Sequence, residues 1–153
     1  MSSRAKKLLS YKLADYIALG TPGQILTIDD NGYPHTSFTW VVTNSIHLLR
    51  FGVDQESPSL GNIDRSGLVA VQIVTDEGQP YLIKGDAVVA KDLIESAPFP
   101  MALVEMEILE VLDQSWIGVS VTPFDYEWAP EKQEEMLELE QAIYAEMREL
   151  PSD

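Results

Sequence analysis

The chain has 153 residues, 45% of them hydrophobic, which is enough for one domain with its own core over residues 1–153. It contains no cysteine, so disulfides and thiolate metal sites are excluded. The formal net charge of −15 argues against nucleic acid as a partner, because phosphate contacts need clustered lysine and arginine.

No stretch reaches the roughly 20 apolar residues of a membrane helix. The basic residues near the start are not followed by the apolar run of a signal peptide. We therefore expect a soluble protein without a membrane partner. The absence of cysteine suits a reducing compartment, so the expected location is the cytoplasm.

Helical spacing of apolar residues predicts a first helix over residues 5–19, ended by Gly20 and Pro22. The patterns that follow predict seven strands, at residues 24–29, 35–43, 46–53, 68–75, 79–90, 101–112 and 116–121. The sequence Asp30-Asn31-Gly32 marks a hairpin between the first two, because Asn-Gly accepts the positive φ of a tight turn.

Three helical segments are expected beyond the first. Ser57 as N-cap, Pro58 in the first turn and Gly67 as C-terminal cap predict a short helix from residue 58 to about 65. A helical turn is expected near 91–96, and Pro130 opens a last helix over about 130–150. The apolar stripe of that last helix, which is expected to be packed, is Met136, Leu139, Ile143, Met147 and Leu150.

Strands joined mostly by short turns, with flanking helices, predict a mainly β fold. A closed or nearly closed antiparallel barrel is favoured, and an open sandwich is the competing architecture. The second and third strands also carry more large apolar surface than one small barrel readily encloses, from Phe38, Trp40, Phe51 and Val53.

Familiar catalytic signatures are missing from the sequence. It has no P-loop, no Gly-rich dinucleotide fingerprint and no His-Glu-x-x-His zinc helix. The two histidines, His35 and His47, lie on predicted strands, and two isolated histidines without a third ligand predict no metal site. No acid, base or nucleophile is placed by a motif, so the catalytic residues are unassigned.

The order of three segments is informative: the run 22–35 with its Asp-Asn-Gly turn, the run 49–67 with its Arg-Phe-Gly and Asn-Ile-Asp-Arg-Ser-Gly sequences, and the Gly-containing run 83–87. In this order they resemble the opening hairpin, the third strand with its following helix, and the fifth strand of the pyridoxamine 5′-phosphate oxidase-like family. The resemblance covers roughly residues 8–121.

The resemblance implies an antiparallel split β-barrel of the FMN-binding type, and a homodimer with two FMN sites at the subunit interface. It also implies that part of the large apolar surface of the second and third strands lies at that interface. It also implies a flavin-dependent oxidoreductase, whose substrate the sequence does not identify. In the family, the second strand lays its backbone along the flavin ring, and the third strand with the turn after it holds the ribityl chain and phosphate. The matching cofactor-binding residues are Ser37, Thr39, Trp40, Val41, Arg50, Phe51, Gly52, Ser57 and Ser59.

The segment expected to hold the phosphate departs from the family pattern. Residues 57–61 include no lysine or arginine, and Pro58 removes one N–H donor. Arg50 is then the best-placed cation, and a surface pair with Asp54 or Glu56 is its competing role. This departure supports an alternative function, a non-catalytic dimeric split barrel that has lost flavin or binds another small ligand; haem, held by one of the histidines, is a less favoured case.

Overall fold

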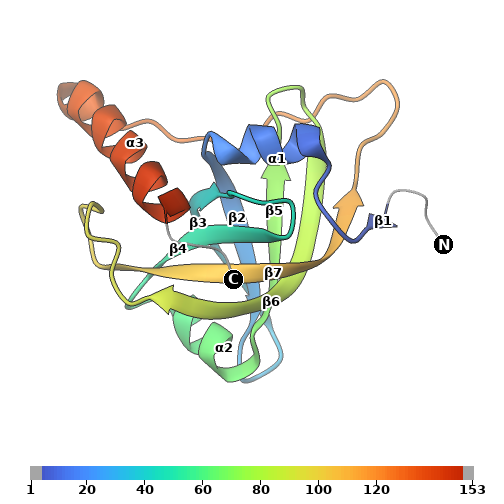
Figure 1. Ribbon diagram of the computed structural model, residues 1–153, viewed down its shortest axis with the longest axis horizontal. Coiled ribbons are helices and arrows are strands. Elements are labelled where there is room, and N and C mark those ends of the chain that lie inside the picture. Colours follow the sequence, from blue (N-terminus) through green and yellow to red (C-terminus); the bar gives the residue numbers. More distant parts are fainter. Residues whose placement is uncertain (1–4, 150–153) are drawn as a thin grey trace.

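The computed structural model describes residues 5–149 of the chain (Figure 1). Seven strands belong to one antiparallel sheet: β1 (Ala5–Lys6), β2 (Thr21–Ile28), β3 (Pro34–Val42), β4 (Leu48–Asp54), β5 (Leu68–Val74), β6 (Pro80–Lys91) and β7 (Met101–Asp113). The helices are α1 (Tyr11–Ala18), α2 (Pro58–Ser66) and α3 (Gln133–Glu149), the last preceded by the 3-10 turn η1 (Pro130–Lys132). Within the described part of the chain, no helix is both long and apolar enough to cross a membrane.

The sheet closes on itself. Its strand order is β1-β7-β4-β3-β2-β5-β6, and β6 pairs in turn with β7. Six strands, β2 to β7, therefore form a closed barrel, to which β1 adds a short edge strand. The prediction of a mainly β antiparallel barrel is confirmed, and the competing open sandwich is wrong.

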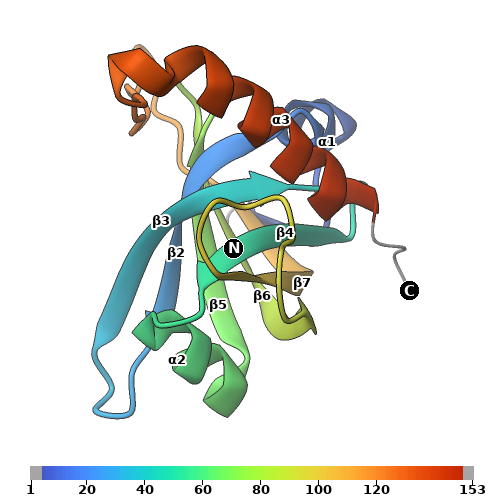
Figure 2. The same ribbon diagram turned by 90° about the vertical axis from the view of Figure 1, so that its left-hand side faces the viewer.

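The barrel is held unevenly around its circumference. β6 and β7 pair along most of their length, from Tyr81–Asp113 to Lys91–Leu103. Among the described residues, β3 and β4 pair only at Val41–Phe51 and Val42–Arg50. Beyond these pairs the two strands diverge, and α2 follows β4 at that end of the barrel (Figure 2). This opening between β3 and β4 is the split of the barrel.

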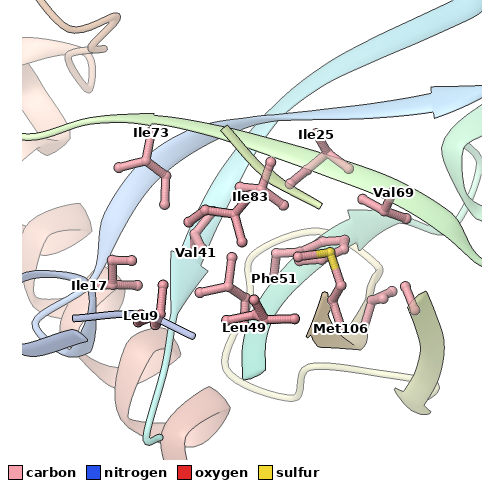
Figure 3. Close-up of a cluster of buried hydrophobic side chains, with 14 of the residues drawn as sticks. Leu9, Ile17, Ile25, Val41, Leu49, Phe51, Val69, Ile73, Ile83 and Met106 are labelled. Atoms are coloured by element: carbon pink, nitrogen blue, oxygen red, sulfur yellow. The ribbon is translucent and has the colours of Figure 1, made fainter. Parts of the chain in front are cut away.

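The main core fills the barrel because alternate residues of each strand point inward. Ile25, Ile73 and Ile83 are fully buried there, from β2, β5 and β6 (Figure 3). α1 adds Ile17 to the same core, and α2 adds Ile63. The two helices lie at opposite ends of the barrel, so they cover both of its openings (Figure 1).

α3 lies outside the barrel, across the outer face of β3 and β4 (Figure 2). As predicted, Ile143 and Met147 are buried, Leu139 and Met136 are half-buried, and Leu150 falls outside the described residues. The glutamates of the opposite face are exposed, at Glu134, Glu138 and Glu149. The second core cluster formed under α3 comprises Trp40, Val42, Ile94, Met101, Leu103, Ile143, Tyr144 and Met147.

Three predicted elements are wrong. The first helix does not begin at residue 5, because β1 pairs with β7 and the helix starts after Ser10, whose Oγ accepts from the N–H of Leu13 (3.1 Å). No helical turn forms at 91–96, where β6 ends and a loop folds back toward α3. No strand forms at 116–121: Trp116, Ile117 and Val119 are exposed, so this apolar run belongs to a surface segment.

Candidate functional site

The residues predicted to bind a cofactor divide between several environments. Val41 and Phe51 point into the barrel core and are fully buried (Figure 3). Their side chains are therefore committed to packing. Only their backbone could face a ligand.

Three of the predicted residues meet at the start of α2. Ser57 caps this helix, and its Oγ accepts from the N–H of Ser59 (3.1 Å). The Oγ atoms of Ser59 and Ser37 are 3.1 Å apart, and Ser59 is fully buried. Pro58 has no N–H, and the N–H of Leu60 donates to the carbonyl of Ser57 (3.2 Å). The donors of the first turn are thus used within the protein.

Thr39 and Gly52 meet across the split. The hydroxyl of Thr39 donates to the carbonyl oxygen of Gly52 at 2.6 Å, and both residues are buried. This contact joins β3 to β4 just beyond the end of their ladder. The two predicted residues are close together, but they are already bonded to each other.

Arg50 lies on the outer face of β4, beneath the end of α3, and is fully buried. Its Nε and Nη2 donate to Oε1 of Glu105, at 3.0 and 2.8 Å. Its Nη1 donates to the carbonyl oxygens of Met147 and Arg148, at 3.2 and 3.3 Å. The expected surface pairing with Asp54 or Glu56 is therefore wrong. The carbonyl end of a helix is negative, which suits a guanidinium placed there.

A doubly charged phosphate does not fit the start of α2. The guanidinium of Arg50 is held under α3, while the charged residues just before the helix are the exposed acids Asp54 and Glu56. Arg65, near the other end of α2, donates to the carbonyl of Ile28 and to Oδ1 of Asn62. Anion binding at a helix start needs free N–H groups or cations, and the first-turn donors described above are occupied.

A larger cavity lies elsewhere, between the outer side of β2 and β5 and the segment 114–124 that follows β7. Its volume is about 700 Å³. Residues with apolar surface form most of its wall: Pro22, Phe38, Val74, Pro80, Leu112, Trp116, Val119, Val121, Pro123 and Phe124. We call this cavity the groove. The sequence did not indicate this groove, because residues 116–121 were predicted to be a strand of the barrel. In the structure they belong to an irregular segment that lines one side of the groove.

The polar groups of the groove are mostly amides. Nε2 of Gln72 donates to Oε1 of Gln114 (2.7 Å), and the half-buried Gln24 lies beside Gln72 in the register of β2 and β5. Asp113 is also on the wall, and its Oδ1 accepts from the N–H of Ser115 (2.8 Å). Apolar walls with a few convergent polar groups are typical of small-molecule sites.

Trp40, the remaining predicted residue, lines a second cavity of about 200 Å³ that shares Phe38 with the groove.

The histidines lie apart from both cavities: neither His35 nor His47 is on their walls. Within residues 5–149, no group of three or more His, Cys, Asp or Glu side chains could hold a metal ion.

No protein-family model and no curated protein matches the chain. Solved structures match its fold. A proposed pyridoxamine 5′-phosphate oxidase from Lactobacillus delbrueckii has a TM-score of 0.59 at 17% identity, over 70% of this chain and 95% of that one. HupZ from Group A Streptococcus also scores 0.59, at 15% identity over 74% and 99%. A second proposed pyridoxamine 5′-phosphate oxidase, from Listeria innocua, scores 0.54 at 13% identity over 67% and 95%.

At identities of 13–17%, these structural matches show the fold of the chain and do not show its ligand or its reaction. The closed six-stranded barrel with its flanking helices matches the split-barrel fold of these solved structures. The resemblance found in the sequence is confirmed at this level: the chain has the split-barrel fold of the pyridoxamine 5′-phosphate oxidase-like proteins.

Proposed function

We propose that this protein binds a planar ring ligand of the flavin class in the groove, as a homodimer, and that a bound flavin gives it an oxidoreductase activity. The observation that carries the proposal is the groove itself, about 700 Å³ with apolar walls and glutamine amides. Small-molecule sites usually measure roughly 300–1,000 Å³, so the size is adequate for a fused ring system.

The walls of the groove suit a flat ligand. Phe38, Trp116 and Phe124 offer aromatic surface to its faces. The amides of Gln72 and Gln114 each carry donors and an acceptor, which match the N–H and C=O groups on the edge of a ring such as isoalloxazine. Two solved structures with this fold are described as proposed pyridoxamine 5′-phosphate oxidases, which also supports a flavin.

The ring of the flavin, and not its phosphate, should provide most of the binding free energy. The donors at the start of α2 are occupied by Ser57 and its neighbours, and Arg50 is held by Glu105. A flavin that lacks the phosphate should therefore bind as well as FMN. The flavin supplies the hydride chemistry when bound, while the groove residues orient the ring and exclude water.

A second candidate is the non-catalytic dimer that has lost flavin. The observation that favours it is the occupied first turn of α2, where the family is expected to hold the phosphate. In that case the same groove would hold another planar ligand.

The homodimer rests on a different surface from the one expected from the sequence. Of the four large apolar residues assigned to an interface, Trp40, Phe51 and Val53 are buried within one chain, and only Phe38 is exposed. That reason for a dimer is therefore wrong. The support now comes from segment 114–124, where Trp116, Ile117, Val119 and Phe124 are exposed together and would be covered by a second copy.

Titration of riboflavin and of FMN, followed by quenching of flavin fluorescence, tests the proposal. We expect saturable binding of both with dissociation constants within about threefold, because no charge-assisted phosphate contact distinguishes them. Gln72→Leu should weaken both, whereas Ser57→Ala should leave both unchanged. FMN binding more than about tenfold tighter than riboflavin would show that the phosphate is recognised. Failure of both flavins to bind would leave the non-catalytic dimer as the function.

A further inference from the structure

The second cavity is lined almost entirely by aromatic side chains. Its volume is about 200 Å³. Its wall consists of Phe38, Thr39, Trp40, Phe99, Met101, Tyr126 and Trp128, which come from β3, the loop before β7, β7 itself and the segment before α3. Phe38 and Phe99 are partly exposed at its rim, while Trp40 and Met101 are buried. We call it the aromatic pocket.

The rings of the aromatic pocket are held in several orientations. Trp40 stacks on Phe99, with centroids 6.1 Å apart and planes 3° apart. Tyr126 is perpendicular to Phe38 (5.9 Å, 85°) and to Trp128 (5.7 Å, 86°). The ring faces therefore do not all lie parallel, and a ligand in the pocket can meet aromatic surface on more than one side.

The polar groups of the pocket are already engaged. The hydroxyl of Tyr126 accepts from Nε1 of Trp40 (2.7 Å), and the hydroxyl of Thr39 donates to Gly52 (2.6 Å). A primary ammonium carries three donors that need acceptors, and a hard metal ion needs several oxygens. The side chains of the pocket offer two hydroxyl oxygens, those of Thr39 and Tyr126, which are too few for either cation. A quaternary ammonium has no N–H, so it needs no hydrogen-bond acceptor, and it is attracted by the negative faces of aromatic rings.

A buried carboxylate lies behind the wall of the pocket. Nε1 of Trp128 donates to Oε1 of Glu140 (3.0 Å), and Glu140 is only 8% exposed. Burial raises the pKa of this carboxyl, and the nearby Asp125 raises it further. Among the residues that the structure describes, Glu140 forms no ion pair. The raised pKa means that the charged form of Glu140 is costly without a cationic partner, and a cation bound nearby would favour that charged form.

We propose that the aromatic pocket binds the methylated head of a small quaternary ammonium compound. The rings supply cation–π attraction from several sides, and Glu140 adds a negative charge behind Trp128. The net charge of −15 attracts cations and repels anions as they diffuse toward the protein. This proposal does not depend on flavin binding, since the groove and the aromatic pocket share only Phe38.

Tryptophan fluorescence gives a direct test. The chain has three tryptophans, and Trp116→Phe leaves only Trp40 and Trp128, which both line the aromatic pocket. In this background we expect choline and tetramethylammonium to change the emission saturably. The neutral isostere of choline, 3,3-dimethylbutan-1-ol, should bind at least about tenfold more weakly, because it lacks the charge. Equal binding of the neutral isostere, or no response to either cation, would overturn the proposal.

Phe99→Leu is the informative variant, because it keeps an apolar side chain at the rim and removes one aromatic face. It should weaken choline binding by roughly three- to thirtyfold. Phe124→Leu is the matched control, since Phe124 lies on the same segment as Tyr126 but lines the groove, and it should leave choline binding unchanged. Equal weakening by both variants would overturn the proposal.

Phosphatidylcholine vesicles separate a free ligand from a membrane-held head. Trp40 and Met101, which line the pocket, are buried, and this favours the free compound, so we expect the protein to bind choline and not to sediment with vesicles. Sedimentation with vesicles in the absence of choline binding would overturn the assignment to a free ligand.

Discussion

Arg50 on β4 and Glu105 on β7 form a partly buried ion pair, with Nη2 of the guanidinium 2.8 Å from Oε1 of the carboxylate. The same guanidinium donates to the last carbonyls of α3, at Met147 and Arg148. One side chain therefore joins two neighbouring strands to the helix that covers them. Arg50 therefore stabilises the packing of β4, β7 and α3 and is not a surface charge.

Replacing Arg50 by methionine should destabilise the protein strongly. The substitution leaves Glu105 largely buried without its cation and leaves the end of α3 without its donors. Breaking one partner of a buried pair typically costs about 3–5 kcal/mol of the free energy of unfolding. Urea unfolding of the variant measures the loss. The exposed pair Lys84–Glu110 is the control, because Lys84→Met should cost at most about 1 kcal/mol. Equal small effects would contradict the role given to Arg50.

Glu146 should make stability depend on pH in the acid range. Burial acts to raise the pKa of this carboxyl, but hydrogen bonds from Lys91, from Ser96 and from the backbone of Glu95 outweigh it and lower the pKa to about 2. A pKa below the unfolded value of 4.5 means that the stabilisation is present above pH 4.5 and is lost as the pH falls toward 2.

Urea unfolding of wild type and Glu146→Gln across this range checks the assignment. At neutral pH the variant should be less stable by about 1–3 kcal/mol, and the difference should shrink below pH 4.5 as the wild-type carboxylate gains its proton. Glu138→Gln, at an exposed position of the same helix, is the control and should change the free energy of unfolding at neutral pH by no more than about 0.5 kcal/mol. A constant difference at every pH would rule out the charge as its cause.

Gly20 should not tolerate a side chain. Its φ is +92°, and a Cβ there would lie 2.5 Å from the ring of Tyr144 on α3. Gly20→Ala combines a positive-φ cost of roughly 1–2 kcal/mol with an overpacking cost of roughly 1–3 kcal/mol. Gly32→Ala is the control: its φ is +84°, but nothing lies within 4 Å of its Cβ position. Thermal or urea unfolding should show the larger loss for Gly20→Ala, and an equal loss would mean that α3 moves aside.

The exposed apolar segment 114–124 should control assembly. Ile117 is fully exposed, with Trp116 and Val119 beside it. We expect light scattering to show a dimer at micromolar concentration, and Ile117→Glu to shift it toward monomer by placing charges in the apolar contact. Leu137→Glu, at an exposed position of α3, should leave the dimer intact. A wild-type protein that is monomeric under these conditions would refute the dimer.

Local signals in the sequence predicted the elements that local physics builds. The Asn31-Gly32 turn forms, with Gly32 at positive φ. Ser57 and Gly67 cap α2 as expected, the latter at φ +70°. Alternating apolar residues predicted six strands and the inward stripe of α3, because a period of two or of 3.6 residues fixes which side chains share a face. The strand predicted at 116–121 does not form, because the hydrophobicity of a segment does not show whether the folded protein will bury it.

The environment of each predicted site residue was decided by the tertiary structure. Ser37 and Ser59 are brought together, but Arg50 is drawn to Glu105 and to a helix almost a hundred residues later. The aromatic pocket likewise joins Trp40 to Tyr126, which no local pattern connects. By itself the sequence determined the strands, turns and caps, because these depend on neighbours along the chain. Only the tertiary structure decided the groove, the aromatic pocket and the partner of each buried polar group, because those contacts join segments that are far apart in the sequence and no local pattern relates them.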